Sequence, residues 1–108
     1  MNKPLMQRAR RHTRQSGDAL LALMALANAA DADGVHPVFG NVQSDVRAAR
    51  ALELLEAHGE IVRVGGGYVV AIAFMPRDLK EIFVRRFRMS PRAASAIVSE
   101  AVARQLMN

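Results

Sequence analysis

The chain of 108 residues has no cysteine and no tryptophan, and its aromatic side chains are four phenylalanines and one tyrosine. Without cysteine, neither a disulfide framework nor a thiolate metal site is possible. The same absence is consistent with a reducing compartment. Since aromatic residues are scarce, the core must be built from Ala, Val, Leu, Ile and Met. Such a composition favours helices that pack closely through small side chains.

Long apolar segments are also missing. The longest apolar run, Ala19–Ala27, is far below the ~20 residues that a membrane-spanning helix requires. The N-terminus is basic but has no apolar stretch of the kind found in signal peptides. A length of 108 residues suits one domain. We therefore expect a single-domain cytoplasmic protein.

Positive charge is concentrated at the two ends of the chain, although the net charge is only +5. Residues 1–15 have five basic and no acidic side chains, residues 16–73 have three basic and seven acidic, and residues 74–108 have seven basic and three acidic. The three segments therefore have net charges of +5, −4 and +4. Basic segments attract polyanions, so a nucleic acid is expected to contact the ends rather than the middle.

The first fifteen residues, Met1–Gln15, are polar and basic and show no sustained apolar period. They are predicted to form a flexible arm, with residues 16–108 as one folded domain. In several DNA-binding families such an arm contacts phosphates or enters the minor groove. The alternative is a solvated tail without a binding role. Under the DNA hypothesis, the side chains of the arm that contact DNA are Arg8, Arg10, Arg11 and Arg14.

Apolar periodicity and capping residues predict four helices in the remainder of the chain. Their expected ranges are Ser16 or Asp18 to about Ala30, Asn41 or Ser44 to about His58, Pro76 or Arg77 to Phe87, and Pro91 to about Met107. A short strand is predicted at Val35–Phe39, where Pro37 confines it to a sheet edge. Two β-branched runs separated by three glycines, Glu60–Val64 and Tyr68–Ala73, predict a β-hairpin. The expected fold class is α+β, with about four helices and one β-hairpin.

The helix in the middle of the chain and the hairpin after it are the first candidate for reading DNA. They include the segments Val46-Arg47-Ala48-Ala49-Arg50-Ala51-Leu52 and Leu55-Glu56-Ala57-His58-Gly59, followed by the hairpin. This region resembles the recognition helix and wing of a winged-helix domain. The resemblance makes Gln43, Arg47 and Arg50, at i, i+4 and i+7, candidate DNA contacts. Only Gly40–Gln43 is left for the helix that a winged-helix domain has before its recognition helix, and a helix followed by a hairpin is also common as scaffold.

The C-terminal segment is the second candidate, and it is favoured because it is basic. Its sequence is Leu79-Lys-Glu-Ile-Phe-Val-Arg-Arg-Phe-Arg-Met-Ser-Pro-Arg-Ala-Ala-Ser-Ala-Ile-Val-Ser-Glu-Ala101. It resembles a bacterial helix-turn-helix, which has a small residue in its first helix, usually a glycine in the turn, and aliphatic residues inside the second helix. Here these places fall on Val84, Arg88, Ala94 and Ile97. Because Arg88 stands where glycine is usual, we expect it to be left-handed or distorted, at a cost of ~1 kcal/mol or more.

The helix-turn-helix resemblance also implies roles for the outward-facing side chains. In the second helix these are Arg92, Ser95, Ala96 and Ser99. Arg92 is expected to contact a guanine or a phosphate, the serines to hydrogen-bond with base edges or phosphates, and Ala96 to let a thymine methyl approach. The phosphate backbone is then held by Arg85, Arg86 and Arg88. The alternative is an amphipathic helical hairpin whose arginines keep it soluble.

Side chains arranged for catalysis or metal binding are not found in the sequence. His12, His36 and His58 are scattered, without a carboxylate or a second histidine at ligand spacing. Gly65–Gly67 lies between two strands, so it lacks the helix N-terminus that a phosphate-binding loop uses. We therefore expect no enzyme activity, no cofactor and no metal.

The function that the sequence favours is sequence-specific binding of double-stranded DNA by a small transcriptional regulator. Small residues across Ala93–Ala103 let another helix approach closely, so a homodimer is expected. The alternative is a small protein-binding inhibitor or accessory subunit of a larger nucleoprotein complex. RNA binding is less favoured, because the few aromatic residues form no stacking motif.

Overall fold

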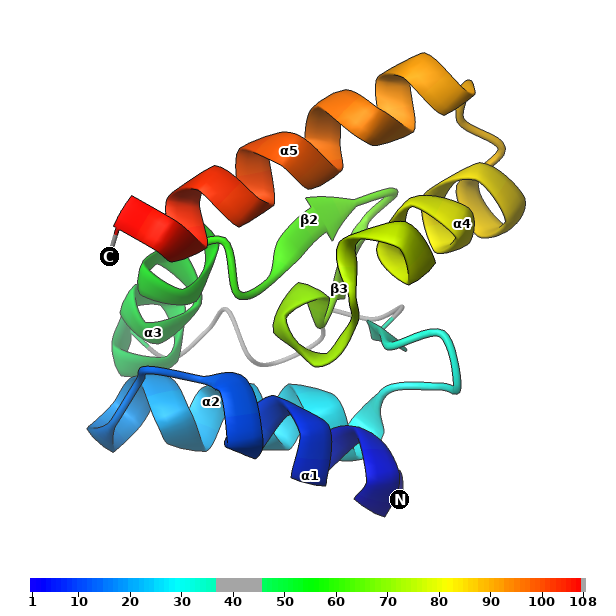
Figure 1. The fold of residues 1–108 in the computed structure, drawn as a ribbon. Helices are drawn as coiled ribbons and strands as arrows, with labels where there is room; N and C mark the ends of the chain where they lie inside the picture. Colours follow the sequence, from blue (N-terminus) through cyan, green and yellow to red (C-terminus); the bar gives the residue numbers. More distant parts are fainter. Residues whose placement is uncertain (37–45, 108) are drawn as a thin grey trace.

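The computed structural model of the chain describes residues 1–36 and 46–107. These residues form five α-helices and a three-stranded antiparallel sheet (Figure 1). Their order is α1 (Lys3–His12), α2 (Gly17–Ala29), β1 (Val35–His36), α3 (Val46–Ala57), β2 (Val62–Val64), β3 (Gly67–Val69), the 3-10 helix η2 (Ala71–Ala73), α4 (Pro76–Phe87) and α5 (Pro91–Met107). The expected mixture of helix and sheet is confirmed. The described part of the chain has one α-helix more than the four expected, because α1 was not foreseen.

The sheet has β3 at its centre, in the order β1–β3–β2. Val35 of β1 and Val62 of β2 both lie opposite Val69 of β3. Gly65 and Gly66 form the tight turn of the β2–β3 hairpin, and both have positive φ angles, +56° and +82°. A hairpin loop of two residues needs a left-handed backbone at its central residues, and these two glycines supply it.

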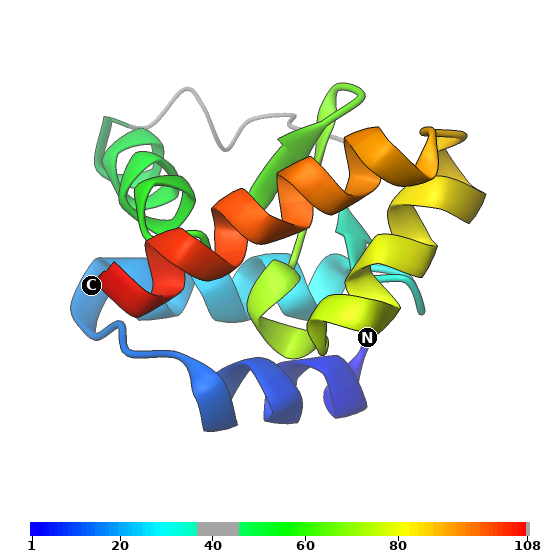
Figure 2. The same ribbon diagram turned by 45° about the horizontal axis from the view of Figure 1, so that its top comes forward.

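Helices cover both faces of the sheet (Figures 1 and 2). Apolar side chains form a separate core on each face. The reason is the alternation of side chains along β3 and the residues after it, because successive residues point to opposite faces. On one face Tyr68 and Val70 pack with α1, α2 and α3. On the other face Val69 and Ala71 pack with α4 and α5, where Phe83 is fully buried. The sheet therefore separates α1 from the N-terminal half of α5.

Residues 3–12 form a helix that is packed on the domain, which corrects the expectation of a flexible arm. Leu5 and Ala9 are fully buried, and α1 contacts both α2 and η2. The side chain of Asn2 caps the helix by accepting a hydrogen bond from the Leu5 amide at 3.2 Å, and it donates one to the carbonyl of Asp31 at 2.9 Å. After the helix, the Thr13 hydroxyl contacts the carboxylate of buried Glu60 at 2.5 Å. With only two buried residues, α1 has too few apolar positions to show a helical period in the sequence, so its packing on the domain was not predicted.

The remaining elements agree with the sequence-based ranges except at a few places. The four predicted helices are confirmed as α2, α3, α4 and α5, and the hairpin is confirmed as β2 and β3. Ala71–Ala73, expected in the second strand, forms η2 instead. The strand predicted over Pro37–Phe39 and the helix caps predicted at Asn41 or Ser44 lie outside the described residues.

Candidate nucleic-acid interface

The turn between α4 and α5 is closed by Arg88 in a left-handed conformation, with φ +54° and ψ +34°. Among the described residues, Arg88 alone has a positive φ without being glycine. The Met89 amide donates to the carbonyl of Phe83 at 3.3 Å, which is the six-residue closure of a Schellman C-cap. Ser90 then caps α5, because its hydroxyl accepts from the Ala93 amide at 3.1 Å. The left-handed arginine expected at this position is confirmed.

The N-terminal half of α5 has a buried face and an exposed one. Ala94 and Val98 are buried against the sheet and α4. Arg92, Ala96 and Ser99 are exposed, and they lie on one side because they are spaced by four and three residues. Ser95, which was expected to face outward with them, is half-buried. The first acidic residue of the helix is Glu100, so the exposed surface before it is polar and basic.

Arg85 and Arg86 of α4 are ion-paired with two aspartates in the loop between α2 and β1. Arg85 lies 2.7 Å from the Asp33 carboxylate, and Arg86 lies 2.8 Å from Asp31 and 3.2 Å from Asp33. The negative charges that the sequence places in the middle of the chain thus neutralise the end of α4. Arg88 and Arg92 remain beside this network, and neither has an ion-pair partner in the part of the chain that the structure describes.

The same ion pairs shift the pKa values of their members. The hydrogen bond from Arg85 lowers the pKa of Asp33, an effect that partial burial opposes and that the charges of Arg85 and Arg86 reinforce. Hydrogen bonding and attraction to Asp33 raise the pKa of Arg85, and those to Asp31 raise the pKa of Arg86. The pairs that Asp33 makes with Arg85 and Arg86 therefore stabilise the fold only while Asp33 is ionised.

We expect the Asp33→Asn variant to lose about 1 kcal/mol or less of folding free energy at neutral pH, since the pairs are partly exposed. A carboxylate whose pKa is lowered on folding stabilises the protein above its unfolded pKa of about 3.9, and this contribution is lost as the pH falls through the folded pKa. Urea denaturation of both proteins from neutral to acidic pH measures the difference. The difference should disappear at low pH, whereas the control Glu53→Gln, exposed on α3, should match the unmodified protein throughout. A gap between Asp33→Asn and the unmodified protein that persists at acidic pH would contradict the ion-pair explanation.

The middle candidate, α3, presents a weaker basic surface. Arg47 makes a two-pronged contact with the Asp18 carboxylate, at 3.0 and 3.2 Å. Arg50 is exposed, and Glu53 is exposed one turn further along the same helix. Gln43, the third side chain assigned to this surface, lies outside the described residues. Since Asp18 already holds Arg47, the face of α3 has less charge available for phosphates than the sequence indicated.

The four arginines of the expected arm are all exposed on or just after α1. Arg8 lies over the ring of Phe74, with its guanidinium carbon 5.1 Å from the ring centre. For Arg10, Arg11 and Arg14, the described ranges contain no ion-pair partner. These side chains therefore form a second basic surface, which the sheet separates from the N-terminal half of α5.

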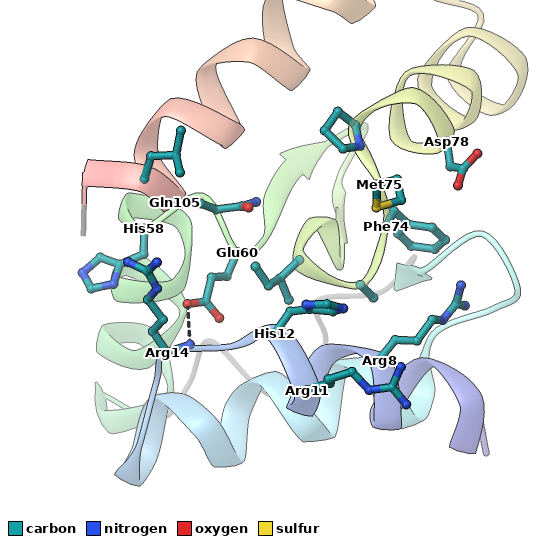
Figure 3. A pocket seen from close by; sticks show the side chains of 14 residues that line it. Arg8, Arg11, His12, Arg14, His58, Glu60, Phe74, Met75, Asp78 and Gln105 are labelled. Atoms are coloured by element: carbon teal, nitrogen blue, oxygen red, sulfur yellow. Dashed lines mark hydrogen bonds between the residues drawn. The ribbon is translucent and has the colours of Figure 1, made fainter.

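A cavity of about 420 Å³ lies beside this second surface (Figure 3). We call it the α1 cavity. Four separate segments contribute to it, residues 8–14, 58–60, 72–78 and 105–106, so no local pattern in the sequence indicates it. It is lined by Arg8, Arg11, His12, Arg14, His58, Glu60, Ile72, Ala73, Phe74, Met75, Pro76, Asp78, Gln105 and Leu106.

Glu60 is buried at the α1 cavity, and its carboxylate is held by surrounding donors. One oxygen accepts from the Thr13 hydroxyl at 2.5 Å, and the other accepts from the Gln15 amide side chain at 2.9 Å and the Arg14 backbone at 3.4 Å. The Gln15 side chain also lies 2.6 Å from the His58 ring nitrogen Nδ1. These hydrogen bonds hold the segment after α1 against Glu60, which lies just before the hairpin. They also stabilise the negative charge of the Glu60 carboxylate.

Comparison of the chain with protein-family models, with curated proteins and with solved structures finds no match. Within residues 1–36 and 46–107, no helix is both long and apolar enough to cross a membrane. In the same ranges, no three histidine or carboxylate side chains come together as a metal site would require.

Proposed function

We propose that this chain binds double-stranded DNA and reads its sequence with the N-terminal half of α5. The observation that carries the proposal is the α4–α5 turn, where a left-handed Arg88 leads into a capped helix whose exposed face begins with Arg92. In helix-turn-helix proteins the N-terminal residues of the second helix contact the bases. Arg92 then contacts a guanine, Ala96 and Ser99 lie against neighbouring bases, and Arg88 binds a phosphate.

The order of elements before α4 supports the same class of function. A helix (α2), a strand (β1), a second helix (α3) and a two-stranded hairpin (β2 and β3) follow one another. A winged-helix domain has these elements in the same order, with a further helix between its first strand and its recognition helix, where residues 37–45 lie outside the described ranges. In that arrangement α3 is the recognition helix. We favour α5 because Arg47 is engaged with Asp18, whereas Arg92 has no ion-pair partner among the described residues.

The proposal predicts that Arg92→Ala weakens binding to the preferred duplex by about 5- to 150-fold, because a two-pronged arginine–guanine contact contributes about 1 to 3 kcal/mol. It should also relax the sequence preference at one position. Arg77→Ala is the matched control, since Arg77 is exposed at the opposite end of α4. Selection of bound sequences from a random duplex pool, followed by affinity measurements on the selected duplex, supplies both readouts. A palindrome among the selected sequences is the result expected for a homodimer.

Two outcomes would contradict the assignment of α5. If Arg92→Ala retains full sequence preference while Arg50→Ala loses it, α3 reads the DNA. If the unmodified chain selects no sequence and binds no duplex at about 150 mM salt, its partner is not DNA and the protein-binding alternative replaces the proposal.

A further inference from the structure

The α1 cavity combines cationic side chains at its rim with an apolar floor. Arg8 and Arg11 extend along one side, whereas Arg14 points toward His58 at the other end (Figure 3). Ile72, Ala73 and Phe74 come from η2 and the residue after it, and they supply apolar surface between these ends. Its volume of about 420 Å³ lies within the range of about 300 to 1,000 Å³ that is typical of small-molecule sites.

Arg8 and Phe74 lie together at one side of this cavity. The Phe74 ring packs closely against Gly34, where an added β-carbon would lie only 2.4 Å from its Cε2 atom. The guanidinium carbon of Arg8 lies over the ring, 5.1 Å from its centre. Arg8 is exposed, so a planar group from solvent can also approach its guanidinium. Nucleobases stack on arginine guanidinium planes in this manner.

The charges at the cavity favour an anion despite two carboxylates in its lining. The Glu60 carboxylate already accepts hydrogen bonds from the side chains of Thr13 and Gln15 and from the Arg14 backbone. Asp78 is exposed at the first turn of α4 and does not pair with Arg8, Arg11 or Arg14. Three guanidinium groups therefore surround the opening. Arginine clusters of this kind bind phosphate through charge-assisted hydrogen bonds.

We propose that the α1 cavity binds a nucleotide, with the base placed on Arg8 and the phosphate held by Arg14 at the other end, while Arg11 adds positive charge beside Arg8. The same chemistry is offered by a free nucleoside monophosphate and by one nucleotide of a single strand. The site lies on the other side of the sheet from Arg92 and does not depend on duplex binding. It adds a second nucleotide-recognising surface to the protein.

Titration of the full chain with adenosine monophosphate, ribose 5-phosphate and an eight-residue single-stranded oligoadenylate tests the proposal. At about 50 mM salt, adenosine monophosphate should bind at least about tenfold more tightly than ribose 5-phosphate, because stacking of one base contributes about that factor or more. Binding of the oligomer alone would assign the site to single strands. Binding of the mononucleotide assigns it to free nucleotides.

A pair of double variants separates the cavity from general electrostatic attraction. Arg11→Ala with Arg14→Ala removes two lining charges and should weaken nucleotide binding at least about tenfold. Lys3→Ala with Arg10→Ala removes two charges from exposed positions of the same helix that do not line the cavity, and it should change affinity less than about threefold. Arg8→Lys keeps the positive charge but removes the planar guanidinium group. It should therefore remove the preference for adenosine monophosphate over ribose 5-phosphate.

The proposal is overturned if neither adenosine monophosphate nor the oligomer binds, or if the two double variants weaken binding equally. Equal affinities for adenosine monophosphate and ribose 5-phosphate would refute the stacking of the base on Arg8. Selecting duplexes from a random pool with the Arg11→Ala/Arg14→Ala protein distinguishes a failure of the nucleotide proposal from a failure of the DNA-binding proposal. Sequence preference should persist in that variant even when nucleotide binding is lost.

Discussion

Gly59→Ala is expected to destabilise the protein by about 2 to 5 kcal/mol, because an αL conformation and a steric clash both oppose a β-carbon at this position. Gly59 has a φ of +71°, and an added β-carbon would lie 2.2 Å from the backbone carbonyl oxygen of Ala101 in α5. A backbone atom cannot move aside as the end of a flexible side chain can. The substitution must therefore push α5 away from the end of α3.

This contact matters because Gly59 is where the C-terminal half of α5 meets the rest of the fold. The Gln105 side chain donates a hydrogen bond to the Gly59 carbonyl at 2.8 Å. Arg104 reaches the carbonyl of Glu56 at 3.3 Å. Displacing α5 would weaken both bonds and loosen the packing of Ala101, which is buried. The expected loss is a large share of the roughly 5 to 15 kcal/mol that stabilises a domain.

Chemical denaturation of Gly59→Ala and a matched glycine variant measures the effect. The control is Gly66→Ala, since Gly66 has a φ of +82° but no atom within 4 Å of an added β-carbon. It should lose only about 1 to 2 kcal/mol, the cost of a left-handed alanine. Equal losses for the two variants would show that α5 does not pack against Gly59 as described.

Leu5→Ala is expected to cost about 2 to 5 kcal/mol, as other substitutions of fully buried leucines by alanine do. Leu5 has no solvent exposure, and it packs in the core formed by α1, α2, α3 and the sheet. The loss has two parts, the transfer free energy of the side chain and the cavity that remains between α1 and α2. A flexible arm would give almost no loss at this position, so the variant separates a docked helix from an arm.

Leu21→Ala is the appropriate control for Leu5→Ala, because Leu21 is 69% exposed on α2. It should change the free energy of unfolding by no more than about 0.5 kcal/mol. Thermal and urea unfolding of both variants, followed by circular dichroism, provide the comparison. If Leu5→Ala is as stable as Leu21→Ala, α1 is not part of the folded core.

Local signals in the sequence were sufficient for most elements of the fold. Gly65 and Gly66 between β-branched runs indicated the hairpin, because only left-handed residues close so tight a turn. Ser90 and Pro91 marked the start of α5 through a side-chain cap and a proline in the first turn. Each of these signals acts within a few residues, and each was confirmed.

Features that depend on distant residues were not foreseen. The docking of α1 depends on Asn2 reaching the Asp31 carbonyl, 29 residues away, and on Leu5 packing in a core completed by α2, α3 and the sheet. The pairing of Arg85 with Asp33 joins positions 52 residues apart, and it removes charge from a surface that the sequence had assigned to DNA. Charge counted along the chain therefore indicated a basic end. In the fold, Arg85 and Arg86 are ion-paired, whereas Arg88 and Arg92 have no ion-pair partner among the described residues.

The central claim is that the α4–α5 end of the protein binds double-stranded DNA. Its most direct test is the affinity of the unmodified chain for its selected duplex, measured by fluorescence anisotropy between about 50 and 200 mM salt. The account predicts that the logarithm of the association constant falls linearly with the logarithm of salt concentration, with a slope of about −3 or steeper, since several phosphates are neutralised. Absence of binding at the lowest salt, or an affinity that does not change with salt, would contradict it.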